Sequence, residues 1–212
     1  MDINISAITE AVLKAIENTS TDDGEIPVGI SNRHIHLSKE DVETLFGAGY
    51  ELTPCKELSQ PGQYACKELL TIVGPSLRPI EKVRVLGPVR SASQVEISRT
   101  DAYVLKVAPP VRESGKTEGS APITIIGPKG VVTLKEGLII ANRHIHMSLE
   151  DGEKFGVKDN DYVDVDAYSE RRTRFFDVQV RVHKNFRLEM HLDTDDANAA
   201  GLKNGSKVSI VK

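Results

Sequence analysis

The sequence predicts a mainly β protein, built as two small closed β-barrel lobes with short capping α-helices, and three observations support this. First, a seven-residue phrase occurs twice, at Asn32–Ser38 and Asn142–Ser148, with a single difference. Second, short apolar runs end at Gly-Pro steps, which are typical of strand ends. Third, segments 155–165 and 200–210 share a cadence of glycine, aliphatic residue, lysine, polar turn and alternating strand. Because closed barrels remove exposed sheet edges, we expect a barrel in each lobe.

The first segment, residues 1–20, is predicted to be an amphipathic helix. Ile5, Ile8 and Val12 recur at helical spacing among charged side chains. A polar stretch over 18–24 then ends the helix. Two interpretations remain open: a structural arm that packs on the body of the protein, or a docking peptide for a partner surface.

The rest of the chain is divided between the lobes. Residues 26–32 and 142–212 are assigned to lobe 1, and residues 33–141 to lobe 2, because the duplicated phrase favours two related units. Aromatic residues are few and tryptophan is absent, so the core must be mostly aliphatic. Three aliphatic runs read as strands, at 69–73, 123–126 and 137–141.

The composition excludes several classes of function. With 27 basic and 31 acidic side chains, the net charge of -4 gives no global basic field, so nucleic acid is a poor candidate for the main partner. No apolar run reaches the roughly 18 residues of a membrane span, and no secretory signal is visible, so a cytoplasmic setting is expected. Two cysteines, Cys55 and Cys66, are too few for a disulfide scaffold and are expected to be reduced.

Each copy of the phrase carries a His-x-His pair. In a strand, residues i and i+2 point to the same side, so His34 and His36 can face one point, and His144 and His146 another. Imidazole is a common ligand of zinc and its first-row neighbours. A single such pair is more often a partly buried, hydrogen-bonded pair than a ligand set. Its recurrence favours the metal-binding interpretation.

Both phrases continue into a predicted helix start. Ser38 and Ser148 are expected to be N-caps, with Asp41 and Asp151 at the N3 positions of capping boxes. The helices are expected to end near Phe46-Gly47 and Phe155-Gly156.

The remaining candidate ligands are less clear from pattern alone. His191 lies in a strand-like run before a predicted helix and is a candidate third imidazole. His183 has charged neighbours and is expected to be solvated. Glu96 is expected at the surface, as glutamate usually is.

The segment around Glu96 is rich in arginine and hydroxyl groups. Arginine's planar fork matches phosphate oxygens, so the segment predicts an anion site, although surface arginines also pair with nearby carboxylates. Phosphate-binding glycine loops, a nucleophile elbow and a His-Glu-x-x-His helix are absent. Metal ligands with arginines indicate acyl or phosphoryl transfer. The groups concerned are Arg84, Arg90, Ser91, Ser93, Arg99 and Thr100.

Six motifs in order, covering nearly all of the chain from Ile26, together resemble the PduL-type phosphate acyltransferases, also called phosphate propanoyltransferases. They are Ile30–Ser38, Gln60–Tyr64, Leu86–Arg90, Gln94–Asp101, Ala141–Ser148 and Leu188–Asp195. The resemblance implies that acetyl-CoA or propanoyl-CoA reacts with inorganic phosphate to give acyl phosphate and coenzyme A.

The resemblance also implies site residues. It places one zinc ion with His34, His36, Glu96 and the CoA sulfur, and a second with His144, His146, His191 and water, although other divalent transition metals fit too. It overrides the surface interpretation of Glu96. Arg90 would bind the attacking phosphate and be the catalytic residue. The residues that would line the CoA path are Ser31, Asn32, Arg33, Arg78, Arg84 and Asn198.

The same resemblance implies a homodimer or larger oligomer within a bacterial microcompartment of propanediol or ethanolamine catabolism, with residues 1–20 contacting a shell protein. Two rival functions remain: a non-catalytic zinc-binding shell-docking module, and a zinc-dependent acyl-CoA thioesterase. Neither cysteine adjoins a histidine in the sequence, so neither is expected to carry an acyl group.

Overall fold

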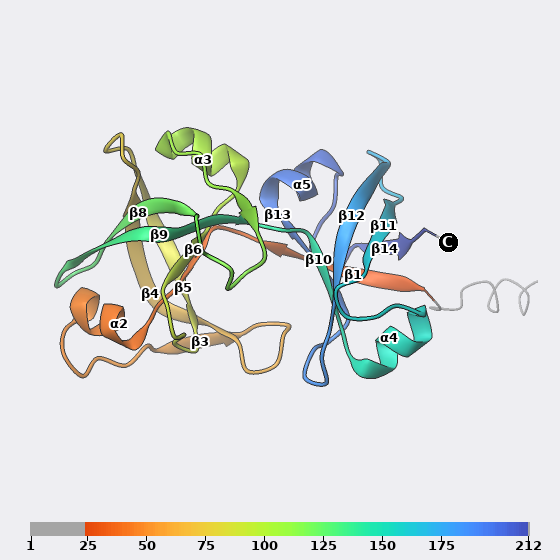
Figure 1. Cartoon of the computed structure of the whole chain (residues 1–212), viewed down its shortest axis with the longest axis horizontal. Helices are drawn as coiled ribbons and strands as arrows, with labels where there is room; N and C mark the ends of the chain where they lie inside the picture. Colours follow the sequence, from red (N-terminus) through yellow and green to blue (C-terminus); the bar gives the residue numbers. More distant parts are fainter. Residues whose placement is uncertain (1–23, 212) are drawn as a thin grey trace, which may run out of the picture.

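The computed structural model describes residues 24–211, and this part of the chain forms two closed six-stranded barrels side by side (Figure 1). The expectation of a mainly β protein with short helices is confirmed. The helix expected over residues 1–20 lies outside the described residues. Two separate clusters of buried, largely aliphatic side chains fill the barrels.

Lobe 1 is the barrel on the right of Figure 1. Its strands close in the order β1-β13-β10-β12-β11-β14. Their bounds are β1 (Glu25–Ser31), β10 (His144–Met147), β11 (Tyr162–Ala167), β12 (Thr173–Val182), β13 (Glu189–Asp193) and β14 (Lys207–Ile210). The two segments with a shared cadence end in β11 and β14, which pair with each other. Asn160 and Gly205 both have positive φ angles at the turns before these strands.

Lobe 2 closes as β4-β5-β2-β6-β9-β8, because β8 pairs with both β4 and β9. Short strands β3 (Pro54–Glu57) and β7 (Val111–Arg112) add to β4 and β9. The Gly-Pro steps lie at strand ends, as predicted: Gly74-Pro75 directly follows β4, Gly87 is the last residue of β5, and Gly127-Pro128 directly follows β8. The barrel strands are β2 (His34–His36), β4 (Tyr64–Val73), β5 (Pro79–Gly87), β6 (Gln94–Glu96), β8 (Ala121–Ile126) and β9 (Val131–Ala141).

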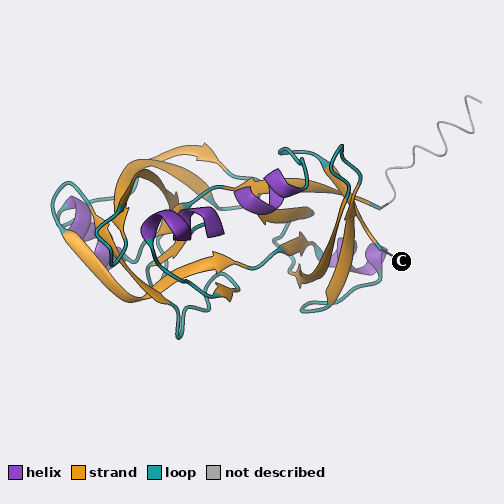
Figure 2. Ribbon diagram, turned by 90° about the horizontal axis from the view of Figure 1, so that it is seen from above, coloured by secondary structure: helices purple, strands orange, loops and turns teal. Residues whose placement is uncertain are grey.

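Short helices cap the barrels. They are α2 (Lys39–Phe46), α3 (Arg99–Leu105), α4 (Leu149–Phe155) and α5 (Thr194–Ala199). The starts and ends predicted for α2 and α4 are confirmed. Helix α3, whose N-cap is Ser98, was not predicted from the sequence. Figure 2 shows α3 and α5 on the same side of the molecule, and the backbone N–H of Thr100 donates to Asp195 across them at 2.7 Å.

The predicted capping boxes differ between the copies. In α4, Ser148 and Asp151 form the reciprocal box. In α2, Ser38 accepts from the Asp41 N–H, but the Asp41 carboxylate accepts from the Ser93 hydroxyl instead of from the N-cap N–H. The expectation of a full box at Asp41 is therefore wrong, because a side chain distant in sequence competes for the carboxylate.

The chain crosses between the barrels at each copy of the repeated phrase. It passes from β1 of lobe 1 to β2 of lobe 2, and back from β9 of lobe 2 to β10 of lobe 1. After each crossing, the central isoleucine of the His-x-His strand, Ile35 or Ile145, is fully buried. Burying such a side chain contributes roughly 1.5–3 kcal/mol. The isoleucines therefore fix the histidines on the opposite face.

Between residues 24 and 211 none of the helices is long and apolar enough to span a bilayer.

Both cysteines are free, as expected, with Cys55 exposed and Cys66 buried. Burial raises the pKa of the Cys66 thiol to about 11, which makes it a poor nucleophile at neutral pH.

Candidate metal centres

The first group of candidate ligands lies in lobe 2. His34 stands directly opposite Glu96 in the antiparallel pair β2–β6. The Nε2 atom of His34 is 3.5 Å from Glu96 Oε2, and Nε2 of His36 is 4.0 Å from Oε1. All three side chains are buried. The pattern-based expectation of a surface Glu96 is therefore wrong, because β6 is an interior strand between β2 and β9.

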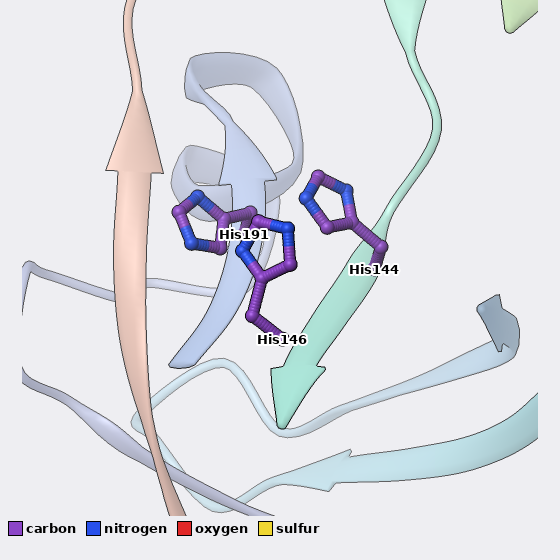
Figure 3. Close-up of side chains that lie close together, drawn as sticks. All are labelled: His144, His146 and His191. Atoms are coloured by element: carbon purple, nitrogen blue, oxygen red, sulfur yellow. The ribbon is translucent and has the colours of Figure 1, made fainter. Parts of the chain in front are cut away.

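The second group lies in lobe 1 (Figure 3). His144 stands opposite His191 in the antiparallel pair β10–β13. Their rings are stacked with centroids 5.0 Å apart, and the His146 ring lies 4.6 Å from His144 and 4.7 Å from His191. The third imidazole that the sequence suggested thus faces the pair. By contrast, His183 is exposed, as predicted.

Backbone carbonyls orient the first histidine of each pair. His34 Nδ1 lies 2.8 Å from the carbonyl oxygen of Asn32, and His144 Nδ1 lies 2.8 Å from that of Asn142. A donor Nδ1–H leaves Nε2 with its lone pair free for a cation, the arrangement common among metal-bound histidines. The two copies therefore repeat their second-sphere contacts as well as their sequence.

The residues present fit a metal ion. In each group, one potential ligand atom per residue lies within 4.8 Å of the others. The buried Nδ1 atoms of His36 and His146 have no hydrogen-bond partner. Unpaired buried polar atoms are costly, and a bound cation would satisfy them. Sets of three protein ligands leave a fourth position open, as catalytic zinc sites do.

Burial keeps most of the imidazoles neutral. It lowers the pKa of His36 to about 3, with further lowering from the nearby His34 and Arg90. It lowers the pKa of His144 to about 4 and that of His146 still further. A neutral imidazole is the form that binds metals, so these side chains need not lose a proton first.

His34 and Glu96 behave as a coupled pair. Burial alone would lower the pKa of His34, but the charge of Glu96 and the hydrogen bond to it outweigh burial and raise this pKa. The same pairing holds the pKa of Glu96 well below its usual range, although burial opposes it. The charge of Glu96 slightly opposes the lowering of the His144 pKa, of which burial is the main cause.

Ser114, a loop residue that was not predicted from the sequence, joins the lobe 2 ligand group to Arg90. The Ser114 hydroxyl donates to Glu96 Oε1 at 2.7 Å and accepts from Arg90 Nη1 at 3.1 Å. Gln94 donates to both Ser114 and Glu96, at 3.1 and 2.6 Å. Ser114 lies in the loop between β7 and β8. No local pattern marks Ser114, because its role depends on the fold.

Arg181 of lobe 1 was also missed. It stands next to His146 in the parallel pair β10–β12 and contacts Glu113 of lobe 2 at 3.5 Å. Its charge lowers the pKa of Arg90, although burial is the larger cause. Arg181 therefore lies beside the lobe 1 ligand group and contacts the loop that binds Arg90. An alternating strand with several charges offered no signal that would separate Arg181 from a surface residue.

The other arginines of the expected anion site are not gathered there. Arg84 is in register with His34, but its Nη1 donates to the carbonyls of Cys66 and Lys67 at 2.8 and 3.1 Å. The Ser93 hydroxyl bonds to Asp41, and the backbone of Thr100 bonds to Asp195. Ser91 and Arg99 are exposed. Of this stretch, Arg90 is the arginine linked by hydrogen bonds to the lobe 2 ligand group.

The remaining residues expected to line a CoA path lie around α3 and α5. Arg33 forms a two-pronged ion pair with Asp101 of α3, at 2.9 and 2.7 Å. Asn198 is exposed in α5. The exposed Arg78 lies in the β4–β5 turn, where the Ser76 hydroxyl donates to the last residue of α3. Ser31 and Asn32 belong to the β1–β2 crossing.

Comparison with known proteins gives the family of the chain. The family model described as phosphate propanoyltransferase matches residues 27–203. The chain belongs to the phosphate propanoyltransferase family. The phosphate propanoyltransferase of Thermotoga maritima is 62% identical over 188 residues, which cover 88% of this chain and 89% of that protein. That of Lachnoclostridium phytofermentans is 55% identical over 212 residues, 99% of each chain. The chain is therefore an acyltransferase by family.

The electrostatics of this family member make one prediction. In the metal-free chain, Glu96→Gln removes the charge that raises the pKa of His34, so burial then dominates and this pKa falls. Titration of the imidazole signals by NMR measures it. An unchanged pKa of His34 would contradict the assignment of Glu96 as its main partner.

Proposed function

We propose that the chain transfers a short acyl group between coenzyme A and inorganic phosphate. A phosphate oxygen attacks the thioester carbonyl carbon of acetyl-CoA or propanoyl-CoA, a C–O bond forms, and the C–S bond breaks to release CoA. The observation that carries this proposal is the hydrogen-bonded linkage of Arg90 to the lobe 2 ligand group through Ser114. Arg181, which stands beside His146 of the lobe 1 group, contacts Glu113 in the same loop. Membership of the family agrees with this reaction.

The proposed cofactor is zinc, two ions per chain. One ion would be held by His34, His36 and Glu96, and the other by His144, His146 and His191. Zinc bound there would supply Lewis acidity that favours a thiolate over a thiol as leaving group. The chain itself supplies the neutral imidazoles of His36 and His144 and the ionised carboxylate of Glu96, the protonation states that such binding requires.

Arg90 is the proposed phosphate ligand. Phosphate is already anionic at neutral pH, so it needs orientation and charge compensation more than deprotonation. The backbone N–H of Arg90 donates to Leu37 at 2.8 Å, and Ser114 holds its guanidinium. A side chain fixed at both ends loses little freedom when it binds an anion. Ser114 therefore positions Arg90 relative to Glu96.

Coenzyme A is proposed to run along the α3–α5 side of the molecule. The expected residues Arg33, Arg78 and Asn198 are grouped there, and Ser31 and Asn32 lead directly into His34. Arg84 donates a hydrogen bond to the backbone of β4 beside this path, so it also stabilises the barrel. A cationic margin suits the phosphates of the CoA nucleotide.

The reaction is tested by its requirement for phosphate. Release of CoA thiol from propanoyl-CoA should depend on added phosphate and give propanoyl phosphate. Arg90→Ala removes a charge-assisted hydrogen bond worth about 1.5–3 kcal/mol, so kcat/KM for phosphate should fall by about 10–150-fold with zinc content retained. The control is Arg172→Ala, which removes an exposed arginine 5.0 Å over the Tyr168 ring.

Three outcomes of that assay would contradict the proposal or a part of it. Thiol release that continues without phosphate would identify a thioesterase. No thiol release under any condition, with zinc bound, would favour a non-catalytic metal-binding module. Equal loss of zinc and activity in Arg90→Ala would remove Arg90 from its assigned role.

Metal stoichiometry makes a separate prediction. His36→Ala and His146→Ala should each lower the zinc content by one ion per chain, because each removes a ligand from a different group. His183→Ala, which alters an exposed histidine, should retain both ions. Zinc content after dialysis, measured by elemental analysis, decides this. Loss of both ions from either single variant would indicate one shared site instead of two.

We also propose assembly as an oligomer inside a microcompartment, with residues 1–20 contacting its shell; the support is the sequence pattern alone. Deleting residues 1–20 should abolish co-purification with shell proteins and leave thiol release unchanged. Unaltered co-purification would contradict the proposal.

A further inference from the structure

Each candidate metal centre is built on a two-by-two arrangement of side chains from two antiparallel strands. In lobe 2, His34 pairs with Glu96 and His36 pairs with Gln94. In lobe 1, His144 pairs with His191 and His146 pairs with Glu189. Three corners of each arrangement are candidate ligands, and the fourth corners are Gln94 and Glu189. Because strand side chains alternate with period two, both fourth corners face the same side as the ligands.

The fourth corner contacts the third ligand in both lobes. Gln94 Nε2 donates to Glu96 Oε1 at 2.6 Å. Glu189 Oε2 lies 2.9 Å from His191 Nε2, although the angle does not meet that of a hydrogen bond. The chemistry is complementary: an amide donor faces a carboxylate ligand, and a carboxylate acceptor faces an imidazole ligand.

We infer that Glu189 is a positioning residue for the lobe 1 metal centre. Its carboxylate accepts the Nε2–H of His191 and so turns Nδ1 toward the ion shared with His144 and His146. Carboxylates that hold a metal-bound histidine in this way fix its tautomer and increase its basicity as a ligand. The inference rests on the proposed zinc site and adds a residue that the ligand set does not include.

Both lobes hold Glu189 in place. The Ser59 hydroxyl of lobe 2 donates to Glu189 Oε2. The next residue, Gln60, forms two hydrogen bonds with the backbone of Arg187, at 3.0 and 3.1 Å. On the other side, a Cβ at Gly29 would lie 2.6 Å from the Glu189 Cδ atom, so the absence of a side chain there makes room for the carboxylate. The side chain is therefore confined beside His191.

The test measures zinc affinity by competition with a chelator. His34→Ala serves as the background, so that the lobe 1 group is the one left intact. Adding Glu189→Ala should weaken zinc binding by about 10–100-fold. Glu189→Gln, whose amide oxygen can still accept from Nε2, should recover most of that loss. The matched control is Glu153→Ala, which removes an exposed carboxylate of α4 and should leave the affinity unchanged.

Three outcomes would overturn the inference. Unchanged affinity in Glu189→Ala, with zinc bound by the background chain, would overturn the role of Glu189 alone. Equal losses in Glu189→Ala and Glu189→Gln would make Glu189 a ligand. Binding of no zinc by the unaltered chain would overturn both the metal proposal and this inference.

A second variant covers the case in which Glu189→Ala does not fold without metal, as judged by circular dichroism. Ser59→Ala removes a hydrogen bond to the same carboxylate. Zinc affinity unchanged by Ser59→Ala would likewise count against the inference.

Discussion

The pairing register of two short antiparallel strand pairs is the constraint on which the site depends. It places the first histidine of each pair directly opposite the third candidate ligand, Glu96 in lobe 2 and His191 in lobe 1. A slip of one residue would turn the imidazoles into the core and expose Ile35 or Ile145. The two fully buried isoleucines oppose such a slip. Barrel packing and ligand geometry are therefore set by the same register.

The two halves of the molecule share side-chain contacts as well as the repeated seven-residue sequence. In each, the arginine after the asparagine reaches the third residue of a helix that follows the third ligand: Arg33 pairs with Asp101, and Arg143 with Asp196. The same carbonyl contact orients the first histidine in both. The halves differ at the third ligand, a carboxylate in one and an imidazole in the other. The two centres consequently differ by one unit of charge and suit different partners.

Completion of the site depends on contacts between the lobes. Ser114 reaches Glu96 and Arg90 from a loop, and Arg181 comes from the opposite barrel to pair with Glu113 of that loop. Glu189 in lobe 1 is held by Ser59 of lobe 2. Neither barrel alone presents both ligand groups with the arginines. The charged side chains that surround the ligand groups thus lie where the two barrels meet.

The sequence alone determined what depends on short-range periodicity. The His-x-His alternation, the strand ends at Gly-Pro, the caps at Ser38 and Ser148 and the two-barrel architecture all follow from neighbours a few residues apart, and all are present in the structure. The family resemblance added Glu96, which pattern alone placed at the surface. The tertiary structure decided the rest: the burial of Glu96, the diversion of Asp41 to Ser93, and the roles of Ser114 and Glu189. These depend on which distant strands pair, and local propensity carries no information about that because the partners are brought together only by closure of the barrels.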